Sequence, residues 1–234
     1  MRLFIIRHAD PDYPNKTITA AGHLEAQALA RRFQRQRPDR IYCSPLGRAL
    51  HTMQYTADAL GLEPDIEEWT QEMAELQLEY TEGGAMVAWD LPGEVIRERE
   101  GFAAHDRWHA RPPFADPIFR ERWAILQRNS DAFIARHGYE RDGGRYRVVR
   151  SNRETLAIFC HGGFGLTWLA HLLHLPVPLV WSGFWLPPSS VTTILFDERS
   201  SHWAVPRCIG LGDIGHLYEA GLAVQAAGIQ ANFD

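Results

Sequence analysis

The chain has 234 residues, of which 45% are hydrophobic and 23% charged, and its formal net charge at pH 7 is −5. These values suit one globular domain over residues 1–234 with a single buried core, and they exclude a largely disordered chain. The acidic balance also argues against a nucleic-acid partner, which would favour a basic surface.

The first predicted element is a strand at the N-terminus. The short apolar run Leu3–Ile6 contains two β-branched residues and predicts a strand buried on both faces. Arg7 and His8 follow it directly, and a polar loop over 11–18 comes next. A cation and an imidazole therefore stand at the carboxyl end of a strand, where open α/β sheets bind ligands.

Helices and strands alternate in the next fifty residues. We expect helices at Ala20–Gln36 and Leu46–Leu60, and strands at Arg40–Cys43 and Glu63–Trp69. Thr19 is expected to cap the first helix, and Gly61 to end the second. The core stripe of the first helix is expected to contain Leu24, Ala28 and Phe33. This order predicts an α/β fold, with a mainly parallel central sheet between two helical layers.

The middle of the chain, from Gln71 to Arg150, departs from this alternation. It contains many prolines and no clear strand period, so we expect a loop and short-helix insertion over the carboxyl edge of the sheet. Within it, Phe119–His137 predicts one amphipathic helix. Gly143 and Gly144 predict a tight turn, which leads into a strand at Tyr146–Val149 as a hairpin.

The last third begins with a second buried strand that ends in a histidine. Thr155–Cys160 is followed by His161 and a glycine-rich stretch that opens a helix over Gly165–Leu173. A strand at Ser190–Phe196 is expected to pair antiparallel with Trp203–Gly210. The remaining Gly221–Asp234 is expected to be a mobile tail.

The cysteines and the apolar runs bear on location. Cys43, Cys160 and Cys208 are widely spaced and odd in number, which favours reduced thiols over a disulfide framework. The N-terminal apolar run is too short for a signal peptide, and no uninterrupted run is long enough to cross a bilayer. We therefore expect a cytoplasmic protein without a membrane association.

Four motifs occur in a fixed order along the chain. They are Arg7-His8, Thr19-x-x-Gly22-x-x-x-Ala26, Ser44-Pro45-Leu46-x-Arg48-Ala49-x-x-Thr52 and His161-Gly162. Together they resemble the histidine phosphatase superfamily, in the branch that includes cofactor-dependent phosphoglycerate mutase and many small phosphatases. The resemblance extends from Met1 to about Thr193 and implies a phosphoglycerate mutase-like fold.

The resemblance also implies roles for individual residues. His8 takes the position of the histidine that attacks phosphorus and becomes phosphohistidine. Arg7, Arg48, His161 and Gly162 take phosphate-binding positions, and His161 is also counted among the catalytic residues. The family carries a glutamate after its third strand, which here corresponds to Glu72, with Glu75 as the next candidate for the acid and base. Such chemistry requires no metal and no other cofactor.

The chain departs from the family pattern near the nucleophile. Ala9 and Asp10 replace the usual glycine and glutamate or glutamine, which suggests that position 9 needs no positive φ. Asn15 lies one residue beyond the usual asparagine position. We count Asp10, Asn15, Ser44, Glu75 and His216 as possible substrate-binding residues, although a turn role for Ser44 and a structural role for His216 are equally compatible with the sequence.

Eleven histidines invite comparison with metal sites. His105 and His109, and likewise His171 and His174, have spacings that place both rings on one helix face. The His-Glu-x-x-His pattern is absent, however, and no cysteine pair has zinc-finger spacing. The sequence therefore predicts no metal site.

Three functions remain open at this stage. The first is a phosphomonoesterase that hydrolyses a small phosphorylated metabolite and releases phosphate. The second is a phosphoglycerate-type mutase, although the longer family signature after the first histidine is missing. The third is a catalytically inactive module that binds phosphorylated ligands. A homodimer is compatible with all three.

Overall fold

A computed structural model describes residues 1–80, 84–97 and 105–229. Its centre is an eight-stranded mixed sheet in the order β5-β4-β10-β1-β11-β12-β9-β8. These strands are β1 (Arg2–Arg7), β4 (Arg40–Cys43), β5 (Pro64–Ile66), β8 (Tyr139–Asp142), β9 (Arg145–Val148), β10 (Thr155–Cys160), β11 (Val191–Asp197) and β12 (Trp203–Asp213). The four strands from β5 to β1 are parallel, and antiparallel strands continue the sheet beyond β1.

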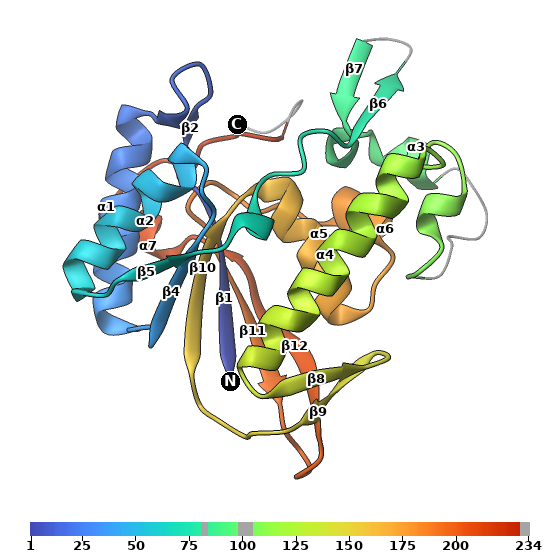
Figure 1. The fold of residues 1–234 in the computed structure, drawn as a ribbon. Coiled ribbons are helices and arrows are strands. Elements are labelled where there is room, and N and C mark those ends of the chain that lie inside the picture. Colours follow the sequence, from blue (N-terminus) through green and yellow to red (C-terminus); the bar gives the residue numbers. More distant parts are fainter. Residues whose placement is uncertain (81–83, 98–104, 230–234) are drawn as a thin grey trace.

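Helices cover both faces of this sheet, so the expected three-layer α/β fold is confirmed (Figure 1). One layer contains α1 (Ala20–Arg35), α2 (Gly47–Leu60) and α7 (Gly215–Ala220). The other contains α4 (Pro117–Arg136), α5 (Gly162–Leu173) and α6 (Val177–Gly183). None of the helices in the described part of the chain combines the length and the apolar character that a bilayer crossing needs.

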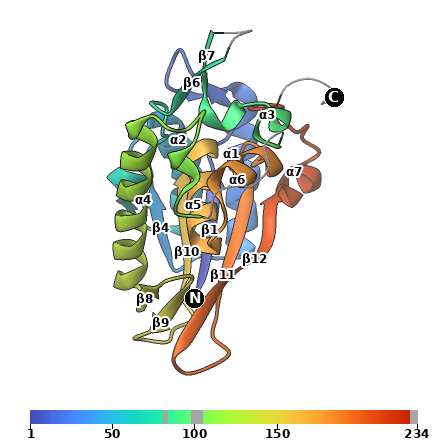
Figure 2. The same ribbon diagram turned by 90° about the vertical axis from the view of Figure 1, so that its right-hand side faces the viewer.

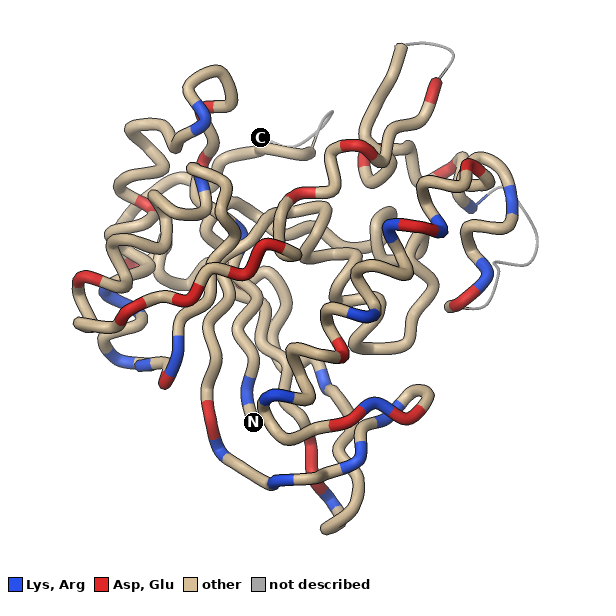
Figure 3. The backbone as a smooth tube through the Cα atoms, in the orientation of Figure 1, with Lys and Arg blue, Asp and Glu red and all other residues tan. Residues whose placement is uncertain are grey.

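The central strands are buried on both faces because their alternating side chains enter two separate cores. Leu3 and Ile5 of β1 pack on the side of α4 and α5, whereas Phe4 and Ile6 pack on the side of α1 and α2. In β1, β4, β10 and β11 any charged residues stand at the strand ends, whereas β5, β8, β9 and β12 also carry charged residues within their length (Figure 3).

The expected core stripe of the first helix is partly wrong. Ala28 and Phe33 are buried, but Leu24 is 50% exposed. At 100° per residue, the buried face of α1 is centred on Ala26, Leu29 and Phe33, and Leu24 points away from it. Thr19 does cap this helix, since its side chain accepts a hydrogen bond from the Gly22 N–H.

The region 71–150 is only in part an insertion. Its first half holds short elements at the carboxyl end of the sheet: the hairpin β6 (Gln77–Tyr80) and β7 (Gly84–Val87), helix α3 (Gly93–Arg97), and 3-10 turns at Ala88–Asp90 and Trp108–Ala110. Figure 2 shows this hairpin and α3 at the end opposite to the N-terminus. The second half belongs to the main fold, because α4 covers one face and the hairpin β8-β9 joins the sheet through β12.

Several other boundaries differ modestly from expectation. The strand expected at Glu63–Trp69 is the shorter β5, because the chain turns at Glu68–Thr70. Helix α5 begins at Gly162, three residues earlier than expected. The two-stranded β2 (Pro11–Asp12) and β3 (Thr17–Ile18) lie within the loop after β1.

The expected mobile tail is wrong for residues 221–229. The carbonyl oxygen of Ala227 accepts hydrogen bonds from Arg7 Nη1 at 2.9 Å and from Trp185 Nε1 at 3.3 Å. Local composition did not predict these contacts, because they join segments that are 220 and 42 residues apart in the sequence. Residues 230–234 lie outside the described part of the chain.

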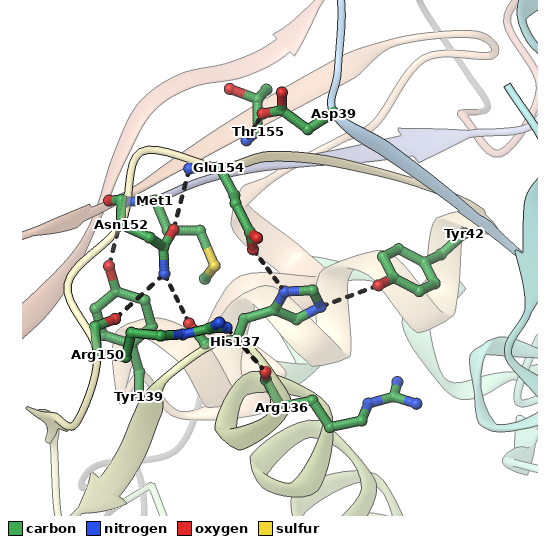
Figure 4. Close-up of polar contacts among 10 residues, drawn as sticks. All are labelled: Met1, Asp39, Tyr42, Arg136, His137, Tyr139, Arg150, Asn152, Glu154 and Thr155. Atoms are coloured by element: carbon green, nitrogen blue, oxygen red, sulfur yellow. Dashed lines mark hydrogen bonds and ion pairs between the residues drawn. The ribbon is translucent and has the colours of Figure 1, made fainter. Parts of the chain in front are cut away.

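A polar cluster closes the amino end of the sheet (Figure 4). His137, which follows α4, bonds through Nε2 to the Tyr42 hydroxyl at 3.1 Å and through Nδ1 to Glu154 Oε2 at 3.0 Å. The Asn152 side-chain amide donates to the His137 carbonyl at 2.7 Å. The cluster therefore fixes the end of α4 to the starts of the central strands, at the end of the sheet away from His8.

Candidate active site

The register of two parallel strands brings the two key histidines together. Arg7 of β1 lies opposite Cys160 of β10, so His8 and His161 follow equivalent positions on neighbouring strands. Their ring centroids are 5.3 Å apart, and both side chains are almost completely buried. The expectation that these two separated segments converge is met by the geometry.

Hydrogen bonds fix the tautomer of His8. Its Nδ1 lies 2.7 Å from the Ala9 carbonyl oxygen, which can only accept, so the proton sits on Nδ1 and Nε2 keeps its lone pair. Burial, together with Arg7 and Arg48, holds the pKa of His8 well below its ordinary value. His8 is therefore a neutral imidazole with a free electron pair on Nε2.

The backbone around His8 is held from two sides. The Ala9 N–H donates to Thr52 Oγ1 at 2.9 Å, and the His8 carbonyl accepts from the Ser189 N–H at 3.0 Å. Ala9 is not among the residues with positive φ, as its identity suggested. The backbone at His8 and Ala9 is thus fixed by residues from α2 and from the segment before β11.

The Arg7 guanidinium group is hydrogen-bonded to the backbone through Nη1, whereas its Nε has no protein partner among the described residues. Nη1 donates to the carbonyls of Leu186 at 2.6 Å and Ala227 at 2.9 Å. Nε itself is buried. A Cβ at position 162 would lie 3.3 Å from that Nε, so glycine at this position leaves room beside the Arg7 guanidinium group. The remaining edge matches the geometry of a phosphate oxygen pair.

Arg48 approaches from the start of α2. Its guanidinium carbon lies 5.5 Å from the centroid of the Tyr13 ring, which is within the range of a cation–π contact. Its Nε is buried without a partner in the described part of the chain. Burial lowers the pKa of Arg48 from its ordinary value, and Glu72 is the largest opposing influence.

His161 and Ser44 form a pair beside His8. His161 Nε2 and Ser44 Oγ share a hydrogen bond of 2.7 Å, while His161 Nδ1 is buried without a described partner. Burial, followed by the neighbouring His8 and the two arginines, holds the pKa of His161 well below its ordinary value. Ser44 thus orients His161, and its Oγ also accepts the Leu46 N–H in the turn.

The Glu72 carboxylate lies at the N-terminus of α5. Oε2 accepts from the Gly163 N–H at 3.1 Å, and Oε1 accepts from Phe164 N–H at 2.7 Å and from Met73 N–H at 3.2 Å. Burial raises the pKa of Glu72, while these donors and Arg48 oppose the rise. At a given pH, the protonated form of Glu72 is therefore more populated here than it would be in water.

These groups meet at one cavity. Arg7, Arg48, Glu72 and Gly162 all line a cavity of about 780 Å³ at the carboxyl end of β1 and β10. His8 and His161 lie next to the two arginines, which affect the pKa of both rings. In the described ranges, no three His, Cys, Asp or Glu side chains are arranged to hold a metal ion.

Four of the residues expected to bind substrate do not line this cavity, namely Glu75, Asn15, Asp10 and His216. Glu75 forms an ion pair with Arg122 at 2.5 Å and does not line this cavity. Asn15 bonds to Asp12 at 2.8 Å on the surface. Asp10 accepts the Thr19 hydroxyl at 2.7 Å and so closes the loop before α1.

His216 also lies outside the cavity and has a supporting position. It is buried, and its Nε2 shares a 3.1 Å hydrogen bond with Ser189 Oγ. The Ser189 N–H in turn donates to the His8 carbonyl, so Ser189 links His216 to His8. His216 is not among the residues that line this cavity, and these contacts fit the structural alternative.

Sequence reasoning missed a buried carboxyl near His8. Glu25 is 1% exposed, its Oε2 accepts the Asp10 N–H at 3.0 Å, and burial raises its pKa to about 7. Its Oε1 is buried without a partner among the described residues. The available signal was helical spacing, because Glu25 lies between Gly22 and Leu29 on the buried face of α1.

The fold and this geometry define an α/β protein with a neutral imidazole and with one buried and one partly buried guanidinium group at a single cavity. The family model of the histidine phosphatase superfamily (branch 1) matches residues 3–207, and the chain belongs to this superfamily.

Comparison with individual proteins gives more distant similarity. A relative from Hydrogenobacter thermophilus, provisionally named a phosphoserine phosphatase, is 35% identical over 82 residues, which cover 31% of this chain and 40% of that protein. The match thus spans less than half the length of this curated relative.

Two solved structures share the fold over nearly their whole length. The phosphoserine phosphatase of Entamoeba histolytica, solved with phosphoserine, has a TM-score of 0.59 and 18% identity, covering 92% of this chain and 98% of that one. The alpha-ribazole phosphatase of Shigella flexneri has a TM-score of 0.57 and 19% identity, covering 92% and 97%.

Proposed function

We propose that this protein is a phosphatase that hydrolyses phosphate monoesters of small molecules, with His8 as the nucleophile. The supporting observation is a set of three buried nitrogens around His8 that have no partner among the described residues: Arg7 Nε, Arg48 Nε and His161 Nδ1. Buried polar groups are normally hydrogen-bonded, and guanidinium groups match phosphate oxygens. Family membership and the phosphatase names of the similar proteins support the same activity.

In the first half of the reaction, the lone pair of His8 Nε2 forms a bond to phosphorus. The bond between phosphorus and the ester oxygen breaks, and Glu72 gives its proton to that oxygen as the alcohol leaves. Arg7 and Arg48 stabilise the negative charge on the phosphoryl oxygens during transfer. The product of this half is phosphohistidine and a free alcohol.

In the second half, water attacks the same phosphorus atom. Glu72, now a carboxylate, takes a proton from the water, the bond from phosphorus to Nε2 breaks, and phosphate leaves. Both His8 and Glu72 return to their starting protonation states. Glu72 is favoured over Glu75 for this role because it lines the cavity with both arginines, whereas Glu75 pairs with Arg122.

The direct test measures phosphate release from a panel of phosphate monoesters. We expect the wild-type protein to release phosphate without added bisphosphoglycerate, and His8→Ala to abolish release, with His23→Ala on α1 as the matched control. A requirement for bisphosphoglycerate would favour the mutase alternative. Binding of phosphorylated ligands without any release would favour a binding module.

A further inference from the structure

The cavity continues from the phosphate-binding end into a space with largely aromatic and aliphatic walls. Its lining there includes Trp89, Leu166, Trp181, Phe184, Trp185 and Leu186. Phe184 is 39% exposed although it is aromatic, and it faces this space. A cavity of about 780 Å³ is also within the range of pockets that hold drug-sized molecules. The walls therefore suit a large, apolar leaving group.

The two tryptophans at the inner end are held in place by backbone contacts. A Cβ on Gly163 would lie 2.5 Å from the Trp89 ring, so the indole rests directly on the backbone at the start of α5. Trp185 donates from Nε1 to the Ala227 carbonyl, which also accepts from Arg7. The aromatic walls are thus positioned relative to the phosphate-binding groups.

The charges that line this space are unevenly distributed. Apart from Arg7, Arg48 and Glu72, the only charged side chain that lines the cavity among the described residues is Asp90. Arg97 lies behind the lining residue Gly183, since its Nη2 would be 3.4 Å from a Cβ at that position, but Arg97 itself does not line the cavity. Asp90 is exposed to solvent at the cavity wall, and Arg7 is the cation that favours its charged form.

With Arg7 and Arg48 engaged by the phosphate, a second anionic group on the substrate would find a carboxylate and no further basic partner in the described lining. A cation or a hydrogen-bond donor would instead find a partner in Asp90. We propose, on the basis of the phosphatase activity proposed above, that the alcohol portion of the substrate is aromatic, carries no second anion, and directs a cationic or hydrogen-donating group toward Asp90. Phosphoserine, the ligand in the Entamoeba structure, has a carboxylate and does not meet this description.

Three aryl phosphates with nearly the same phenol leaving group test the proposal. They are 4-ethylphenyl phosphate, phosphotyramine, and the phosphate ester of 3-(4-hydroxyphenyl)propionate, which end in a neutral, a cationic and an anionic group. We expect kcat/KM for the anionic ester to be about tenfold lower than for the neutral ester. The kcat/KM for phosphotyramine should equal or exceed that of the neutral ester.

Two variants assign the effect to the cavity wall. Asp90→Asn should reduce the preference for phosphotyramine over the neutral ester and improve the anionic ester, while Glu75→Gln, outside the cavity, should change neither ratio. Phe184→Ala should lower kcat/KM for the neutral aryl ester more than for glycerol phosphate. Because Phe184 is partly exposed, this variant is expected to fold.

The outcomes separate the two proposals. Equal kcat/KM for the three aryl esters, or ratios that do not change in Asp90→Asn, would overturn the assignment of the leaving group while His8-dependent phosphate release still supported the phosphatase. Absence of His8-dependent phosphate release from every ester tested would overturn the proposed function itself.

Discussion

The Glu72 carboxyl is subject to opposing influences on its protonation. Burial favours the neutral form, whereas three backbone N–H groups and Arg48 favour the charged form, and burial has the larger effect. A bound phosphoryl dianion would favour the neutral form further. Glu72 can therefore begin the reaction as an acid, which is the state that an alkoxide leaving group requires.

Glu72→Gln should slow hydrolysis of an alkyl phosphate by about 10²- to 10⁴-fold, since no proton is then available for the leaving oxygen. The loss should be smaller for p-nitrophenyl phosphate, whose leaving group departs without protonation. In the wild type, kcat/KM for the alkyl ester should fall as rising pH deprotonates Glu72, and this alkaline decrease should be missing in the variant.

Glu75→Gln serves as the control, because the Glu75 carboxylate pairs with Arg122 outside the cavity. It should retain nearly wild-type rates with both esters. If Glu75→Gln were slow with the alkyl ester and Glu72→Gln were not, the assignment of the acid would be wrong.

At the level of elements, the parallel pair β1 and β10 separates two polar clusters. His8 and His161 follow the carboxyl ends of these strands, whereas His137, Tyr42 and Glu154 link α4 to the sheet away from that edge (Figure 4). The second cluster consists of hydrogen-bonded groups, whereas the first also contains buried nitrogens without a partner among the described residues. We expect the first to determine activity and the second to determine stability.

His137→Phe should therefore lower the free energy of unfolding by about 1 to 3 kcal/mol, because Tyr42 and Glu154 lose their partner. Tyr42→Phe removes only one of these bonds and should cost about 1 kcal/mol. Urea unfolding measures both, and kcat should stay at the wild-type value. A large decrease in kcat in fully folded His137→Phe would show that the two ends of the sheet are coupled.

The convergence of Arg7, His8, Arg48 and His161 could be predicted because it follows from local patterns and a general rule. Each follows a short apolar strand, and the carboxyl ends of parallel strands meet at one edge. The roles of Glu25, Asp90 and residues 221–229 could not be predicted in this way. Their positions depend on packing between segments far apart in sequence, for which the local pattern holds no signal.

At the scale of the whole molecule, buried histidines determine how stability depends on pH. Burial lowers the pKa of six of them. The pKa falls to about 4 for His105 and His216, and it is also lowered for His8, His137, His161 and His171. Between about pH 4 and 6.5 the unfolded chain therefore binds protons that the folded chain does not, and stability falls as pH decreases. The raised pKa values of Glu25, Glu72 and Asp90 act in the opposite direction but involve fewer groups.

We expect the thermal unfolding midpoint to be lower at pH 5 than at pH 7. His105→Phe should make this decrease smaller, because it removes one group that takes up a proton on unfolding. Differential scanning calorimetry across this range measures both. A midpoint that is unchanged or higher at pH 5 would contradict this assignment.

The most direct test of the central claim is to trap the phosphorylated enzyme. Glu72→Gln should be mixed with p-nitrophenyl phosphate, quenched under alkaline conditions that preserve phosphohistidine, digested and analysed by mass spectrometry. We predict that one phosphoryl group is found on His8, and that it is lost after exposure to acid. Release of phosphate by wild type without any phosphoryl group on His8 in the trapped enzyme, or with the group on another residue, would contradict the account.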